Sequence, residues 1–163
     1  MLIVKWLVIV IVVLLAGVIA AGQAGLLQGK APGDLGVREG KLKPPSFTDN
    51  SVSSQAALYP EHPKRAYSEI APLALRGDGS ATLDKLERVV KAMPGAKVVK
   101  REPDYLYATY TTPLMKFVDD VEFWFDPKAQ AIQVRSASRV GRSDLGANRQ
   151  RVEAVRKALA EQS

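Results

Sequence analysis

The chain contains no cysteine and a single histidine, His62. Without cysteine it cannot form a disulfide, use a thiol nucleophile, build a cysteine-ligated zinc site or carry a lipid on an N-terminal cysteine. With one histidine it cannot build a metal site from several imidazoles, and a Ser–His–Asp triad would depend on His62 alone. We therefore expect no metal and no cofactor, and we assign no catalytic residues.

The apolar residues are concentrated at the N-terminus. Residues 2–22 are apolar except for Lys5, and a helix of about 20 residues, rising ~1.5 Å per residue, spans the hydrocarbon layer of a bilayer. Lys5 can extend to the headgroups, and Trp6 suits the interface. We expect residues 1–22 to be a transmembrane anchor. A cleaved signal peptide and the core helix of a soluble protein are the alternatives.

The charges that flank the anchor give conflicting indications of topology. Lys30, Arg38 and Lys41 follow it closely, which by a count of basic residues favours a cytoplasmic C-terminal side. An N-terminal anchor with a short basic tail, in contrast, acts like a signal sequence and exports the domain on its C-terminal side. We favour export, and expect a single-pass membrane protein of the cell envelope whose C-terminal domain is extracytoplasmic or periplasmic.

The segment after the anchor, residues 23–46, is rich in Gly, Pro and Lys and shows no sustained period. This composition is typical of a linker. Residues 47–163 have the mixed apolar and polar composition of a globular domain and contain no internal repeats.

Periodic patterns in the globular part predict two helices and four strands. The helices, inferred from apolar residues three or four apart, are 82–93 and 144–160. The strands, inferred from alternating apolar and polar residues, are 97–101, 105–111, 117–125 and 130–138. We therefore expect an α+β fold after the transmembrane helix, with an antiparallel meander of about four strands and two helices packed on one face.

The last two strands form a hairpin around the turn Asp126–Ala129. A two-residue loop at Pro127 and Lys128 pairs Phe123 with Ile132 and places Asp120 opposite Arg135. This register matches apolar residues on one face and opposite charges on the other, and a slip by one residue would break both matches.

The same alternation places polar side chains on the face that the helices cover. Asp119, Ser136 and Ser138 share that face, and Asn148 interrupts the apolar stripe of the last helix, which is Leu145, Asn148, Val152, Val155 and Leu159. A buried carboxylate is unfavourable unless it is paired or hydrogen-bonded, so the four polar residues should converge. The cluster either holds the strand end in place or lines a polar pocket.

Residues 135–157 include seven basic and only two acidic residues, so this segment carries +5 of the net charge of +6. A turn rich in arginine before a helix N-terminus suits an anion, because guanidinium groups and free backbone N–H groups point the same way. The candidate anion- or partner-binding residues are Arg135, Arg139, Arg142 and Arg149. A solvated basic face is the alternative, and we do not expect nucleic acid binding because no recognised motif is present.

An enzymatic alternative combines the polar cluster with His62. A hydrolase could use Asp119, Ser136 and Asn148 together with the histidine. The chain has no GxSxG, SxxK or HExxH motif, and a histidine beside a proline is typically a hydrogen-bonding residue of a loop. We therefore favour a binding module over an enzyme.

Several stretches resemble one known family. These are NSVSSQA at 50–56, DYLYATYTT at 104–112, FVDDVEFWFD at 117–126 and IQVRSASRVGRSDLGANRQRVEAVR at 132–156, together with His62-Pro63. They are similar to the family called domain of unknown function 1499, over roughly residues 48–159. The resemblance implies a membrane span or signal near the N-terminus but no mechanism. Some similar members carry a cysteine near position 51, where this chain has serine.

The topology can be tested by a fusion of alkaline phosphatase after Ser163, since this enzyme is active only when it is exported. We expect an active fusion. An inactive fusion, in a strain that exports control fusions, would place the domain in the cytoplasm.

Overall fold

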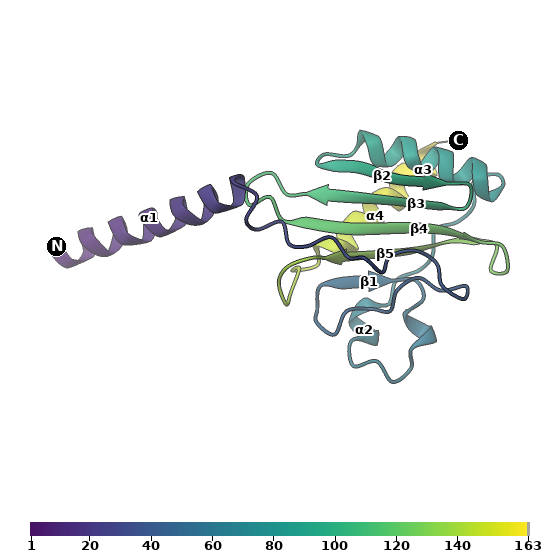
Figure 1. Ribbon diagram of the computed structural model, residues 1–163, viewed down its shortest axis with the longest axis horizontal. Helices are drawn as coiled ribbons and strands as arrows, with labels where there is room; N and C mark the ends of the chain where they lie inside the picture. The colour runs from purple at the N-terminus through teal and green to yellow at the C-terminus, as the bar shows by residue number, and fades with distance from the viewer. Residues whose placement is uncertain (163) are drawn as a thin grey trace.

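The computed structural model describes residues 1–162 and shows one long helix projecting from an α+β body (Figure 1). The body contains a five-stranded antiparallel sheet in the order β1-β5-β4-β3-β2. Its strands are β1 (Ser51–Ser53), β2 (Ala96–Glu102), β3 (Tyr105–Thr111), β4 (Val118–Asp126) and β5 (Ala131–Ser138). The predicted fold class is therefore confirmed, with one strand more than expected because the irregular segment before the first predicted helix contributes β1.

Two helices, α3 (Gly79–Ala92) and α4 (Ala147–Glu161), lie behind the sheet in Figure 1. The apolar core lies between them and the sheet, and Leu86, Phe123 and Val152 are completely buried in it. A single turn of helix, α2 (Arg65–Ser68), and a short 3₁₀ turn, η1 (Ala56–Leu58), lie beyond β1.

Helix α3 begins three residues before the predicted Thr82, because Asp78 rather than a later residue caps it. The Asp78 carboxylate accepts the backbone N–H of Ala81 at 2.7 Å, which satisfies one of the free donors of the first turn. Gly79 lies against Phe125, where a Cβ atom would come within 2.2 Å of the ring. The glycine thus allows the start of α3 to lie directly on β4.

The predicted register of the β4–β5 hairpin is wrong by two residues. Phe123 pairs with Val134 and Asp120 with Ala137, so that Asp126 and Ala131 close the hairpin around a four-residue loop. The Asp126 carboxylate accepts the backbone N–H groups of Lys128 and Ala129 at 2.9 and 3.1 Å. Gln130 comes next in the left-handed conformation, with φ 49°, and these two features lengthen the turn. Because the shift is even, every side chain keeps the face that alternation predicts.

Helix α4 begins at Ala147, and its N-cap residue is Gly146 and not Asp144 or Ser143, which the sequence predicts as caps. The Asp144 carboxylate, two residues before the N-cap, accepts the backbone N–H groups of Gly146 and Asn148 at 2.9 and 3.0 Å. The predicted stripe is buried from Asn148 onward, but its first member, Leu145, is 91% exposed. Leu145 precedes the helix in a left-handed conformation with φ 52°. That conformation costs a residue with a side chain about 1–2 kcal/mol.

Helix α1 (Leu2–Gln23) is long and apolar enough to cross a membrane, and the body buries only Gly22 of it. Its C-terminal end lies on the loop between β3 and β4. The Gln23 amide donates to the carbonyls of Pro113 and Leu114 at 3.2 and 2.8 Å. Gly22 contacts the backbone of Met115, where a Cβ atom would lie 2.6 Å from the carbonyl oxygen.

The second half of the segment predicted as a linker lies on the sheet. Residues 34–46, here called the strap, cross in front of β4 and β5 on the face opposite the helices (Figure 1). Leu42 is only 2% exposed and packs with Tyr105 and Trp124 in a small second core. The strap has no helix or ladder of its own and is fixed by contacts with the sheet.

Candidate functional site

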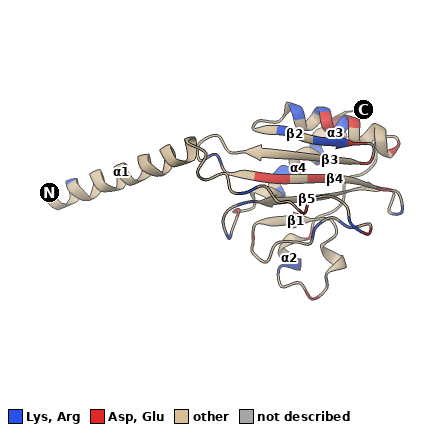
Figure 2. Ribbon diagram, in the orientation of Figure 1, with Lys and Arg blue, Asp and Glu red and all other residues tan. Residues whose placement is uncertain are grey.

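The sheet carries a polar cluster on each face, because successive side chains of a strand point to opposite sides. Asp119 points toward the helices. Asp120 and Glu122 point to the opposite face, where they lie under or beside the strap together with Arg135 and Arg139. Figure 2 shows acidic residues in the first half of β4. We call the first group the helix-side cluster and the second the strap-side cluster.

The structure brings together the four residues of the helix-side cluster, which are Asp119, Ser136, Ser138 and Asn148. The Ser136 hydroxyl donates to Asn148 Oδ1 at 2.5 Å, and Asn148 Nδ2 donates to Ser138 Oγ at 2.9 Å. Asn148 Nδ2 also reaches the backbone carbonyl of Asn50 at 3.1 Å. The amide of Asn148 thus connects α4 to β5 and to the residue that precedes β1.

Arg151, which the sequence patterns did not indicate, completes this cluster. Its guanidinium forms an ion pair with Asp119 and donates to Asn148 Oδ1 at 2.8 Å and to Ser136 Oγ at 3.1 Å. It also lies 4.8 Å from the centroid of the Tyr110 ring. Burial raises the pKa of Tyr110 to about 12, so the ring stays neutral at physiological pH. Every polar side chain at the centre of the cluster therefore has a partner within it.

Asp144 joins the edge of the helix-side cluster through Asn148, whose Nδ2 donates to it at 2.7 Å. Burial alone would raise the pKa of Asp144, but hydrogen bonds from Tyr67, Gly146 and Asn148 outweigh burial and lower the pKa. The charged form of the carboxylate is therefore favoured, and its negative charge in turn stabilises the N-terminus of α4.

His62 does not lie at this cluster. Its ring stacks on Phe47, with centroids 4.8 Å apart, and its Nδ1 accepts the backbone N–H of Lys64 at 3.2 Å. A cavity of about 280 Å³ opens beside Asp119 and Ser138, and His62 is not among its lining residues. The arrangement that the hydrolase interpretation requires is therefore not present among residues 1–162.

In the strap-side cluster, Asp120 pairs with Arg139 and not with Arg135, which corrects the predicted cross-strand pair. Arg139 binds both carboxylate oxygens, through Nε at 2.9 Å and Nη2 at 2.7 Å, and Tyr107 donates to Oδ1 at 2.5 Å. The bond to Asp120 raises the pKa of Arg139, and burial beside Asp120 raises the pKa of Tyr107 to about 12. The two-residue register shift explains the change of partner.

Glu122 is fully buried beneath the strap. Its Oε1 accepts the backbone N–H of Gly36 at 2.7 Å and the hydroxyl of Tyr105 at 2.8 Å. Its Oε2 has no hydrogen-bond partner in the part of the chain that the structure describes, and lies 3.8 Å from Arg135 Nη1. Burial raises the pKa of Glu122 and lowers that of Arg135, because both charges have lost water.

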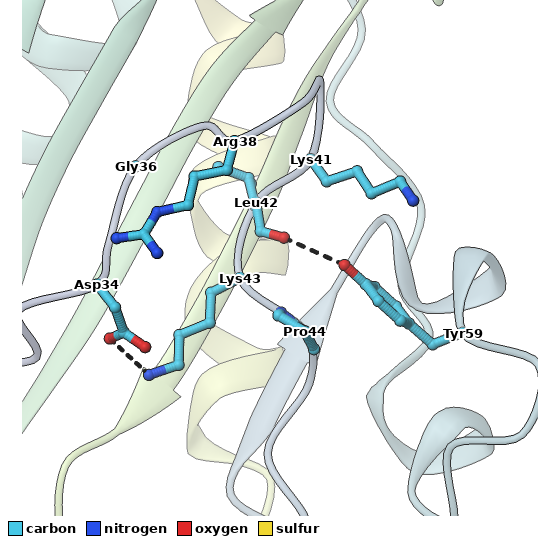
Figure 3. A pocket seen from close by; sticks show the side chains of 8 residues that line it. All are labelled: Asp34, Gly36, Arg38, Lys41, Leu42, Lys43, Pro44 and Tyr59. Atoms are coloured by element: carbon cyan, nitrogen blue, oxygen red, sulfur yellow. Dashed lines mark hydrogen bonds and ion pairs between the residues drawn. The ribbon is translucent and has the colours of Figure 1, made fainter.

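Two cavities lie between the strap and its surroundings. The larger, of about 610 Å³, is lined by Lys30, Pro32, Asp34, Lys43, Pro44, Pro45, Ser46, Phe47, Asp120, Arg135, Ala137, Ser138 and Arg139. The smaller, of about 170 Å³, shares Asp34, Lys43 and Pro44 with it. In Figure 3, Arg38 and Lys43 extend toward Asp34, and Lys43 reaches it at 2.7 Å. We call the larger space the strap cavity.

The structure separates the four predicted anion-binding arginines. Arg135 and Arg139 line the strap cavity, where Arg135 Nε also donates to the carbonyl of Pro44 at 3.2 Å. Arg149 donates to the carbonyls of Tyr67 and Glu69 at 2.6 and 2.9 Å and so holds the segment around α2. Arg142 is exposed in the loop between β5 and α4. The four residues therefore do not form one site.

Sequence reasoning missed Glu122, Lys30 and Lys43. Glu122 lies on the face that alternation assigns to solvent, and the lysines belong to the segment predicted as a linker. Within residues 1–162, no group of three or more His, Asp and Glu side chains is placed to hold a metal ion.

The fold and these clusters define an α+β domain behind an N-terminal apolar helix. Residues 41–159 match the family described as protein of unknown function (DUF1499), which is well over half of the chain. The chain belongs to this family, which confirms the resemblance seen in the sequence. The match begins inside the strap. No curated protein matches the chain.

Replacement of Asp119 by alanine tests the structural role of the helix-side cluster. It leaves the largely buried side chain of Arg151, 11% exposed, without its carboxylate, and we expect the free energy of unfolding to fall by about 3 kcal/mol in denaturant titrations. Asp84→Ala, which breaks an ion pair at a more exposed carboxylate, should change it by no more than about 1 kcal/mol. Equal effects of the two substitutions would contradict the structural role.

The raised pKa of Glu122 predicts a pH dependence of stability. Above the ordinary carboxyl pKa the unfolded chain has lost a proton that the folded protein retains, so Glu122 destabilises the fold as pH rises through its folded pKa. Glu122→Gln keeps an acceptor for Gly36 and removes this titration. As pH rises from about 4.5 to the folded pKa of Glu122, we expect the free energy of unfolding of the parent to fall relative to that of the variant. The fall is about 1.4 kcal/mol per unit of pKa shift.

The measurement is urea unfolding of the parent and the variant at a series of pH values. The exposed Glu102, replaced by glutamine, is the control and should leave the shape of the profile unchanged. Parallel profiles for the parent and Glu122→Gln would refute the assignment.

Proposed function

We propose that the protein is a single-pass membrane protein whose extracytoplasmic domain binds an anionic group in the strap cavity. The group belongs to a small ligand, a lipid headgroup or a partner protein. The observation that carries the proposal is the composition of the cavity wall. Four cationic side chains, Lys30, Lys43, Arg135 and Arg139, face two carboxylates there.

The four cations differ in how far they are already neutralised. Arg139 uses Nε and Nη2 to bind Asp120, which leaves Nη1 for a ligand. Lys43 pairs with Asp34 at 2.7 Å, but both side chains are partly exposed, so an anion can compete for the ammonium group. Arg135 is held by Pro44 at the floor of the cavity. Arg135 also lies 3.8 Å from the Glu122 carboxylate beneath the strap. The side chains that line the cavity still carry two more positive than negative charges, which supports the binding of an anion in a concave, partly apolar site.

The membrane part of the proposal rests on α1. Its length and apolar surface fit a bilayer, and only Gly22 of the helix is buried by the body. A signal peptide would fit the same composition, but the contacts of Gln23 with Pro113 and Leu114 join the helix to the folded domain. These contacts favour a helix that stays with the mature protein.

A hydrolase is the weaker proposal. Ser136 and Asn148 bind each other, and Arg151 binds Ser136 and Oδ2 of Asp119, so the hydroxyl of Ser136 is directed at an amide oxygen and not at a general base. His62 contacts Phe47 and Lys64 instead.

Thermal unfolding of the full chain in a mild detergent, with inorganic phosphate as the probe, tests the proposal. At ten times the dissociation constant, binding stabilises the fold by about 1.4 kcal/mol, which raises Tm by about 3–6 °C. Lys43→Ala should reduce this shift. Arg142→Ala removes a cation outside the cavity and should leave the shift unchanged.

Chloride at equal ionic strength controls for screening. Absence of a shift with phosphate, pyrophosphate and glycerol phosphate would contradict the proposal. A shift that is lost in Arg142→Ala and kept in Lys43→Ala would do the same, since it would place the anion at the β5–α4 loop.

A further inference from the structure

Two loops lie at the end of the body from which α1 emerges (Figure 1). One is the β3–β4 loop, residues 112–117, which the end of α1 contacts through Gln23. The other is the β5–α4 loop, residues 139–146. Gly29 packs against it so closely that a Cβ atom at this position would lie 2.7 Å from Val140 Cγ2. The chain that leaves α1 is therefore bound to both loops.

Large apolar side chains are exposed at this end of the molecule. Leu114 is 54% exposed in the first loop, and Val140 and Leu145 are 42% and 91% exposed in the second. Leu26, just beyond α1, is 76% exposed. We call these four residues the rim. Leu145 is moreover held outward by a left-handed backbone that is unfavourable for leucine.

The charges near the rim are mostly positive. Lys116 lies in the first loop and the exposed Arg142 in the second. Asp144 is the one acidic residue of the two loops, and its carboxylate is occupied by Tyr67 and the start of α4. Exposed leucines beside lysine and arginine are the combination that binds the interface of a membrane with anionic lipids.

We propose that the rim lies on the membrane surface, with its apolar side chains in the interfacial layer and Lys116 and Arg142 at anionic headgroups. The position of α1 indicates that the rim contacts a bilayer and not another protein, because a spanning helix that ends on the β3–β4 loop brings this end of the body to the membrane. The proposal rests on α1 being a membrane anchor and is independent of the anion site. It also places the strap cavity beside the headgroups, since Lys30 and Arg139 line that cavity and adjoin Gly29 and Val140.

The absence of cysteine from the chain allows a direct test with single-cysteine variants of the full protein. Leu145→Cys, labelled with an environment-sensitive fluorophore, is reconstituted into vesicles of phosphatidylcholine with phosphatidylglycerol. We expect its emission to shift to shorter wavelength and to be quenched by lipid-attached quenchers. Val99→Cys is the control, because Val99 is an apolar residue of β2 that is 52% exposed and lies outside the rim, and its label should stay in water.

Ile9→Cys in α1 separates failure of the rim from failure of the anchor. A label in lipid at position 9 and in water at position 145 would overturn the rim and leave the anchor intact. Labels in water at both positions would overturn the anchor as well. Equal shifts at positions 145 and 99 would also overturn the rim, since they would show that the fluorophore itself drives the contact.

The role of the basic residues beside the rim is tested by the lipid composition. We expect a larger shift at position 145 in vesicles that contain phosphatidylglycerol than in vesicles of phosphatidylcholine alone. The added substitution Arg142→Glu should abolish this difference. The same difference in the presence of Arg142→Glu would overturn the role of Arg142.

Discussion

Two buried carboxylates on one face of β4 constrain the whole structure. A buried charge without partners is unfavourable by several kcal/mol, so Asp120 and Glu122 must be compensated from outside their own strand. For Asp120 the partner is Arg139, from the loop after β5. For Glu122 it is a backbone N–H of the strap, at Gly36, together with Tyr105. The strap cannot leave the sheet without exposing Glu122 and Leu42 to water, which explains why a segment with a linker-like composition is ordered.

This attachment links α1 to the domain. The chain is held at the end of α1 by Gln23, at Gly29 by the β5–α4 loop, and along the strap by the sheet. The domain is thus oriented relative to α1 rather than suspended from a flexible tether. The same path encloses the strap cavity, so one set of contacts positions the proposed anion site and brings the rim to the proposed membrane surface.

The sequence was sufficient to predict the class of fold, both main helices, the four long strands and the face on which each residue of β4 and β5 lies. Alternation has a period of two, so it could not exclude the register shift of two residues that moved Asp120 from Arg135 to Arg139. The strap was missed because its hydrogen bonds to the sheet use backbone atoms, such as the N–H of Gly36 and the carbonyl of Pro44, and because the single buried leucine, Leu42, makes no periodic pattern. Arg151, three residues after Asn148, could have been found from helical spacing.

Hydrogen exchange of the strap in the full-length protein tests the central claim most directly. The amide of Gly36 donates to Glu122 at 2.7 Å and that of Leu42 to Gln55 at 2.8 Å. We predict that both exchange slowly, on the timescale of the strands that they contact. Exchange of these two amides at the rate of an unstructured peptide, with β4 and β5 protected, would show that residues 34–46 are a free tether and would contradict the account.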